Sequence, residues 1–153
     1  MNPPTDRRRL RFIVDAMLGN LVSWLRILGY DTLYWSGEDS KLLETAKKTG
    51  RVILTMDRKL ASTALRNNVK TYLIPENQTS QTLAELSKRF GLSLEFDPLQ
   101  TRCPNCNHLL VKIMSEPRDE WICPNCGKHY WIGGHWRNIV RVLEEAKAKI
   151  AEA

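Results

Sequence analysis

The chain has no long apolar run, and its first 102 residues contain no cysteine. A helix that crosses a bilayer needs about 20 predominantly apolar residues in succession, and the apolar stretches here are much shorter. The segment that follows the basic cluster at Arg7 to Arg9 contains Asp15 and Arg26, and it lacks the small-residue cleavage region of a secretory signal. We therefore expect no membrane segment, no signal peptide and a cytoplasmic protein.

The cysteine-free part of the chain is long enough to be a domain, whereas the part that holds the cysteines is not. A module of about thirty residues buries too little apolar surface to fold without a metal or disulfides. The 153 residues therefore predict one domain of about a hundred residues, followed by a small module that a metal or disulfides hold together. We expect no organic cofactor.

The cysteines form two CPNC units separated by sixteen residues. They are Cys103, Cys106, Cys123 and Cys126. This spacing is typical of a four-thiolate zinc site, and four sulfur ligands leave no position for a reactive water. We expect one structural zinc ion per chain, with disulfides, which a reducing compartment disfavours, and iron-sulfur ligation as alternatives. His108 and His129 lie near the two units, but four cysteines already complete the tetrahedron.

Basic residues outnumber acidic residues by 23 to 17, which gives a formal net charge of +6. An excess of this kind favours a polyanionic partner such as RNA. A basic surface that only keeps the protein in solution gives the same count. The charge is therefore compatible with nucleic-acid binding and does not establish it.

Short strand-like runs alternate with helix-length segments along residues 11–91. The expected strands are Arg11 to Val14, Thr32 to Trp35, Arg51 to Thr55 and Thr71 to Ile74. Apolar residues at three- and four-residue spacings predict helices over residues 16–29, 39–50, 58–68 and 80–91, and a last helix after residue 135. Strict alternation of strand and helix predicts a mainly parallel sheet with helices on its faces. The helical period is lost around Pro98, where we place the domain boundary.

Three aspartates follow successive expected strands: Asp15, Asp39 and Asp57. The carboxyl ends of parallel strands share one edge of a sheet, so these side chains are expected to converge there. Carboxylates within a few ångströms repel one another unless a cation lies between them, and oxygen ligands favour Mg²⁺ or Mn²⁺. Each aspartate taken alone is also a favoured helix N-cap, so a purely structural role is the alternative.

The stretches "FIVDAMLGNLVSWLRILGYDT", "EDSKLLETAKKTGRVILTMDRKL" and "CPNCGKHYWIGGHW" occur in this order. Together they resemble the PIN-like ribonuclease family named after the C-terminal domain of the Mut-seven exonuclease, over roughly residues 10–140. The resemblance implies an α/β, PIN-like three-layer fold with a mainly parallel sheet, a small zinc ribbon and a C-terminal helix. It implies a PIN-like nuclease domain at residues 10–97, the ribbon at 101–132 and the helix at 135–151.

The resemblance also implies a function, which is metal-dependent endoribonuclease activity at Asp15, Asp39 and Asp57 with Mg or Mn. Glu38 and Arg58 are the expected supporting residues: the first as a fourth acid, the second as a phosphate contact. Met56 stands where family members commonly carry a basic residue. The alternative is therefore a non-catalytic RNA-binding or ribosome-associated protein that keeps the fold.

A group of aromatic and basic residues after the second CPNC unit offers stacking surfaces beside cations, as unpaired RNA bases require. The expected RNA contacts are Trp131, His135, Trp136, Arg137 and Arg141. The other interpretation is that these aromatic side chains pack the ribbon against the main domain. The expected partner is RNA, with ribosomal RNA or the ribosome as one possible form of it.

Overall fold

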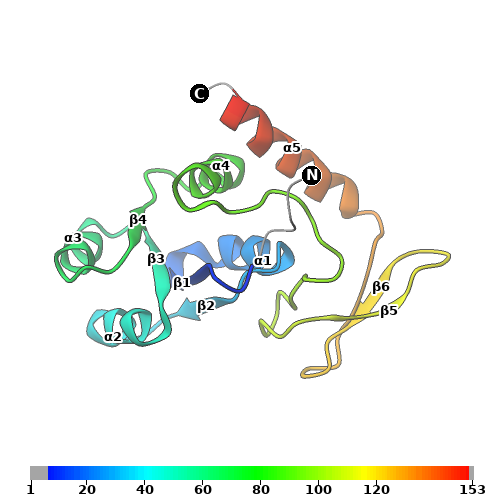
Figure 1. Ribbon diagram of the computed structural model, residues 1–153, viewed down its shortest axis with the longest axis horizontal. Helices are drawn as coiled ribbons and strands as arrows, with labels where there is room; N and C mark the ends of the chain where they lie inside the picture. Colours follow the sequence, from blue (N-terminus) through cyan, green and yellow to red (C-terminus); the bar gives the residue numbers. More distant parts are fainter. Residues whose placement is uncertain (1–6, 152–153) are drawn as a thin grey trace.

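The computed structural model of the protein describes residues 7–151, and its larger part is a four-stranded parallel sheet covered by helices (Figure 1). The strands are β1 (Arg11–Asp15), β2 (Thr32–Trp35), β3 (Arg51–Thr55) and β4 (Thr71–Leu73), in the order β2-β1-β3-β4. The helices between and after them are α1 (Gly19–Ile27), α2 (Asp39–Thr49), α3 (Arg58–Arg66) and α4 (Thr79–Phe90). The predicted parallel α/β fold is confirmed.

Helices cover both faces of the sheet and give three layers (Figure 1). Successive strand residues point to opposite faces, so Phe12 and Val14 of β1 pack with α1 and α4, whereas Ile13 packs with α2 and α3. Every residue of β3 is buried. A strand buried on both sides fits the centre of a parallel sheet, where β3 lies between β1 and β4.

The connection between β1 and α1 differs from the single helix expected over residues 16–29. A 3-10 turn, η1 (Ala16–Leu18), comes first, and α1 starts at Gly19. The Asp15 side chain accepts a hydrogen bond from the Ala16 backbone N–H at 2.9 Å. This cap holds the Asp15 carboxylate at the end of β1 and stabilises the 3-10 turn that follows.

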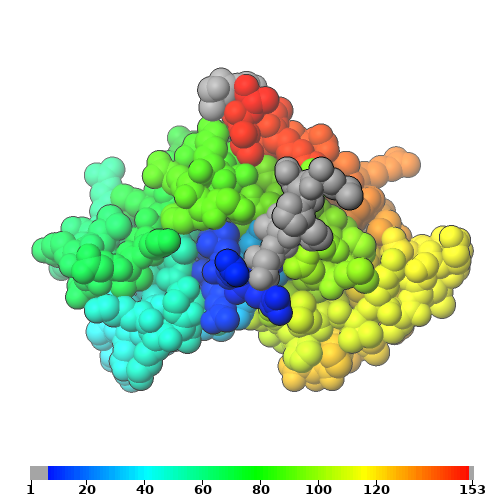
Figure 2. All heavy atoms as spheres, viewed as in Figure 1, coloured from blue at the N-terminus to red at the C-terminus, as the bar shows by residue number. Residues whose placement is uncertain are grey.

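The ribbon is a small antiparallel sheet, β5-β6-β7, made of β5 (Val111–Met114), β6 (Glu120–Ile122) and β7 (His129–Trp131). Figure 2 shows it, in yellow to orange, as a lobe beside the α/β part, with a hollow between it and α2 on the face in view. Helix α5 (Trp136–Ala151) follows and packs along α4, where Leu143 and Ala146 enter the core that α1 and α4 share. Lys147 of α5 pairs with Glu95 at 2.8 Å.

The first cysteine unit is fastened to the turn between α1 and β2. The buried guanidinium of Arg26 donates to the carbonyl oxygens of Thr32, at 3.0 and 2.9 Å, and Pro104, at 2.9 Å. Asn107 donates to the Asp31 carboxylate at 2.7 Å and accepts from the Thr32 N–H at 3.0 Å. These bonds fix the ribbon to the α/β part. None of the helices within residues 7–151 is long and apolar enough to cross a membrane.

Candidate functional site

The carboxyl edge of the sheet carries Asp15 and Asp57, joined through the hydroxyl of Thr55. Thr55 is fully buried at the end of β3 and donates to Asp15 Oδ2 at 2.9 Å. The Thr55 hydroxyl oxygen in turn accepts the Asp57 backbone N–H at 3.0 Å. Asp57 caps α3, because its Oδ1 accepts the N–H groups of Lys59 and Leu60 at 2.9 and 3.2 Å. Two of the three aspartates therefore cap a turn or helix and face the same edge.

Asp39 is the first residue of α2 and does not cap it, because the capping position belongs to Glu38, whose side chain makes no cap bond. Desolvation and then the charges of Asp15 and Asp57 raise the pKa of Asp39 above its ordinary value. The three carboxylates are thus close enough to repel one another. In the described part of the chain, however, their oxygens do not all approach within 4.8 Å of each other.

Glu38 and Arg58, the two residues expected to support the aspartates, lie at the starts of α2 and α3. Glu38 is exposed at the cap of α2, and its backbone carbonyl accepts the indole N–H of Trp35 at 3.2 Å. Arg58 is exposed as the first residue of α3. The loop after β4 adds Glu76, an exposed acidic residue at the corresponding place in the fourth unit.

The four cysteines lie together, with all their sulfur atoms within 4.8 Å of one another. The Sγ atoms of Cys103 and Cys126 are 3.7 Å apart, and those of Cys106 and Cys123 are 3.3 Å apart. Zn–S bonds of about 2.3 Å in a tetrahedron place sulfur atoms about 3.8 Å apart. The cluster is therefore positioned to bind one metal ion.

Backbone amides in the two units favour the thiolate form that binds metals. The N–H of His108 lowers the pKa of Cys106 to about 6, and the N–H of Lys128 lowers the pKa of Cys126. Burial raises the pKa of Cys123 to about 11. The more exposed sulfur atoms, those of Cys106 and Cys126, thus each accept a hydrogen bond from a backbone N–H, which stabilises a thiolate ligand.

Side chains around the cluster support it without joining it. Burial and the contact with Cys103 raise the pKa of Tyr130, so its protonated hydroxyl donates to that sulfur at 3.1 Å. His108 contacts the backbone carbonyl of Leu109 at 2.8 Å. Neither His108 nor His129 belongs to a metal-binding group within residues 7–151.

The aromatic residues after the second unit divide into packed and exposed ones. Phe96 lies between Trp121 and Trp136, with ring centroids 5.9 and 4.8 Å away. Trp136 therefore packs the start of α5 against the linker, whereas Trp131 is 52% exposed. Arg141 is engaged within α5 by Glu145 at 3.1 Å and by Asn138. Arg137 and His135 are exposed.

The model of one protein family, the Mut7-C RNAse domain, matches residues 10–143, nearly the whole chain. The chain belongs to the Mut7-C RNAse domain family. No curated protein and no solved structure matches it. Family membership indicates a nuclease-type role that involves RNA, and the match spans both the sheet with its aspartates and the ribbon.

Two residues of this Mut7-C RNAse domain with clear structural roles, Thr55 and Asn107, were not singled out by the sequence patterns. Thr55 orients Asp15, and its only signal in the sequence was a polar residue directly after the apolar run Val52 to Leu54. Asn107 follows Cys106 as Gly127 follows Cys126, and both have positive φ values, 73° and 77°. The repeat of the CPNC unit thus indicated a residue with left-handed backbone conformation after its last cysteine. It did not indicate the hydrogen bond that Asn107 donates to Asp31. Arg26 links α1 to both β2 and the ribbon.

Proposed function

We propose that this Mut7-C RNAse domain is a metal-dependent endoribonuclease that hydrolyses RNA phosphodiester bonds at the edge formed by Asp15, Asp39 and Asp57. The observation that carries the proposal is the match to the Mut7-C RNAse domain over residues 10–143, together with three aspartates that end or follow successive strands at the carboxyl edge of the sheet. Desolvation and the charges of Asp15 and Asp57 raise the pKa of Asp39, which fits carboxylates that lie near one another. Like charges gathered on one edge are costly without a cation. Oxygen-only donors fit Mg²⁺ or Mn²⁺, which the three carboxylates would hold.

Some groups at this edge orient the carboxylates, and others attract the phosphate groups of RNA. Thr55 and the Ala16 N–H hold the two oxygens of Asp15 in a defined direction. Asp57 Oδ1 is occupied by the backbone of α3, which leaves its second oxygen for a ligand. The starts of α2 and α3 lie at this edge, and helix starts attract phosphate groups.

Arg58, at the start of α3, is proposed to hold the phosphate, and Glu38 to serve as the fourth acid. A bound Mg²⁺ or Mn²⁺ supplies a water of lowered pKa and stabilises charge on the phosphate oxygens. The ribbon is proposed to carry one structural zinc ion at its four cysteines, since this donor set and its sulfur spacing fit zinc. With no open ligand position, that ion takes no part in hydrolysis.

The ribbon and the start of α5 are proposed to help bind RNA through Trp131, His135 and Arg137. Trp136 and Arg141, which also belonged to the expected set, are engaged in contacts within the protein. One observation favours the alternative, a non-catalytic RNA-binding or ribosome-associated protein: the three carboxylates do not all lie within 4.8 Å of one another in residues 7–151.

The experiment compares wild type with Asp15→Asn plus Asp57→Asn on labelled single-stranded and structured RNA, in Mn²⁺, in Mg²⁺ and in EDTA. We expect cleavage that needs a divalent ion and is lost in the double variant, while RNA binding remains. Glu44→Gln, which neutralises an exposed acid elsewhere on α2, is the matched control and keeps full activity. RNA binding without cleavage in any metal favours the non-catalytic alternative and refutes the enzyme.

A further inference from the structure

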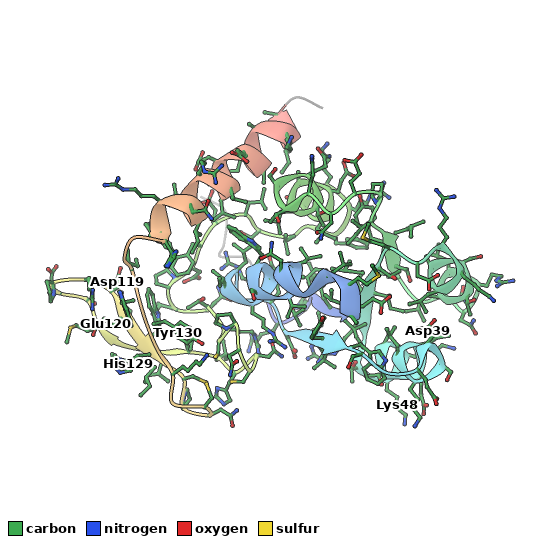
Figure 3. The ribbon with its side chains drawn as sticks, turned by 180° about the vertical axis from the view of Figure 1, so that it is seen from behind. Asp39, Lys48, Asp119, Glu120, His129 and Tyr130 are labelled. Atoms are coloured by element: carbon green, nitrogen blue, oxygen red, sulfur yellow. The ribbon has the colours of Figure 1, made fainter. Side chains whose placement is uncertain are left out.

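A pocket of about 210 Å³ opens on the ribbon beside β7. It is lined by His129, Tyr130, Trp131, Gly133, Gly134 and His135, which include aromatic rings and no acidic residue. We call these six residues the ribbon slot. In Figure 3 the labelled His129 and Asp39 lie at opposite ends of the molecule, so the ribbon slot is remote from the aspartate edge.

The alternation of β7 explains which side chains the ribbon slot exposes. Tyr130 points to one face, where its hydroxyl contacts Cys103, so His129 and Trp131 point to the other face. Both of these side chains are exposed, and Trp131 keeps 52% of its surface accessible. An exposed indole and an exposed imidazole therefore lie on the same face of one strand.

The surroundings hold the Trp131 indole in place. The Arg118 guanidinium lies 5.0 Å from the ring centroid, close enough for a cation–π contact. Gly133 passes beside the ring, where a Cβ would lie only 3.1 Å from the indole nitrogen. Arg118 at the ring and the Gly133 backbone beside its nitrogen edge thus restrict the indole, which still keeps 52% of its surface accessible and lines the ribbon slot.

We propose that the ribbon slot binds one unpaired RNA base, stacked on Trp131, with His129 and His135 beside the polar edge of the base. This inference rests on the proposed function for its RNA ligand. A cavity of about 150 Å³ holds a benzene ring, so the 210 Å³ slot has room for a base. Imidazole nitrogens donate or accept hydrogen bonds, which the polar edge of a base can complete. An apolar protein side chain in the ribbon slot would leave the imidazole nitrogens without a partner.

Charge favours the same occupant. Lys128 and Arg137 are exposed on either side of the ribbon slot in the sequence, and they make no ion pair within residues 7–151. The nearest acidic side chain on the strand opposite, Glu120, is already paired with Arg118 at 3.1 Å. Exposed cations thus flank the slot residues along the chain, which favours a polyanionic ligand such as a phosphodiester chain.

Because the ribbon slot lies far from the aspartate edge, the effect of losing the slot on RNA cleavage should depend on the length of the RNA. A long single strand reaches both places, whereas a very short one reaches only the edge. Loss of the ribbon slot should therefore raise KM for long single-stranded RNA and leave kcat unchanged. Cleavage of an RNA too short to span the molecule should be unaffected.

The test measures fluorescence anisotropy of labelled RNA with the full, zinc-loaded chain and without Mg²⁺ or Mn²⁺, so that binding is read without cleavage. The probes are a single-stranded 20-mer and a blunt duplex of the same sequence. Trp131→Leu removes the stacking surface and should raise the Kd of the single strand by about 5- to 150-fold. Trp131→Phe should recover part of this loss, and duplex affinity should not change.

Two further variants separate stacking from loss of fold. Gly133→Ala adds a Cβ against the indole and should weaken single-strand binding less than Trp131→Leu. Leu109→Ala removes an apolar side chain of similar exposure, 45%, elsewhere in the ribbon and should bind like wild type. Zinc content and melting temperature of each variant show that the ribbon remains folded.

Unchanged single-strand affinity in a folded Trp131→Leu variant overturns the proposal and assigns the ribbon slot to another occupant, such as a protein side chain. An equal loss for single strand and duplex also overturns it. Failure of the nuclease proposal looks different, because Asp15→Asn plus Asp57→Asn leaves this binding intact. Slot-dependent binding without any cleavage would therefore support the ribbon slot and refute only the enzyme.

Discussion

Thr55→Val is the variant that best probes how the fold holds the aspartate edge. Valine has nearly the shape of threonine but no hydroxyl, so the substitution removes two hydrogen bonds and leaves the packing. One bond goes to the charged carboxylate of Asp15 at 2.9 Å, and the other comes from the Asp57 N–H at 3.0 Å. Because Thr55 is fully buried, water cannot replace its hydroxyl.

The size of the effect follows from these two bonds. A hydrogen bond to a charged group contributes about 1.5–3 kcal/mol and a neutral one about 0.5–1.5 kcal/mol, so Thr55→Val should lower the free energy of unfolding by about 2–4 kcal/mol. For a chain of 153 residues this corresponds to a melting temperature lower by about 5–15 °C. Misplacement of Asp15 should also slow RNA cleavage by about 100-fold, since an error of about 1 Å in a reacting group has that effect.

Thr55→Ser is the matched control, because it keeps the hydroxyl and loses only a methyl group. Melting followed by near-ultraviolet circular dichroism, and single-turnover cleavage well below the melting range, measure the two effects separately. We expect the serine variant to keep most of its cleavage rate. A valine variant with wild-type stability and wild-type cleavage would show that Thr55 does not position Asp15, and would refute this reasoning.

Three further predictions concern other parts of the protein. Because desolvation and the charges of Asp15 and Asp57 raise the pKa of Asp39, its ionised form weakens folding above that pKa. Asp39→Asn should therefore stabilise the metal-free protein at pH 7 by about 0.2–1 kcal/mol and reduce the rise in melting temperature on adding Mn²⁺. Burial raises the pKa of Asp31, but hydrogen bonds from Arg51 and Asn107 lower it overall, so its stabilising effect should be present above about pH 4 and lost as pH falls through the lower folded value. Urea unfolding between pH 5 and pH 3 should show a weaker pH dependence in Asp31→Asn, and equal slopes would contradict this assignment. Chelation of zinc should expose β5, β6 and β7 to hydrogen exchange while β1 to β4 stay protected, whereas a ribbon that stays protected would exclude a structural metal.

The parts of the fold that follow from local pattern could be predicted from the sequence. The alternation of strand and helix predicted the parallel sheet, because each βαβ unit is set by neighbouring residues. The spacing of the two CPNC units predicted the cysteine cluster, because four thiolates can meet around one ion only when both units turn toward each other.

Contacts between distant segments could not be predicted in this way. Asn107 and Asp31 are 76 positions apart, and their hydrogen bond depends on how the ribbon lies against the α1–β2 turn. Trp131 and Trp136 have similar sequence surroundings, yet Trp136 packs on Phe96 and Trp131 remains exposed. The difference arises from the linker before the ribbon, which brings Phe96 to one of them only.

The position of Mn²⁺ in crystals of the zinc-loaded protein shows where the chemistry lies, because hydrolysis is proposed at the sheet edge and only a structural ion in the ribbon. Anomalous diffraction at the manganese edge distinguishes Mn²⁺ from zinc. We predict manganese bound by Asp15 and Asp57, with Asp39 beside it, and zinc among the four cysteines. An edge that stays empty at manganese concentrations that saturate RNA cleavage would contradict the account.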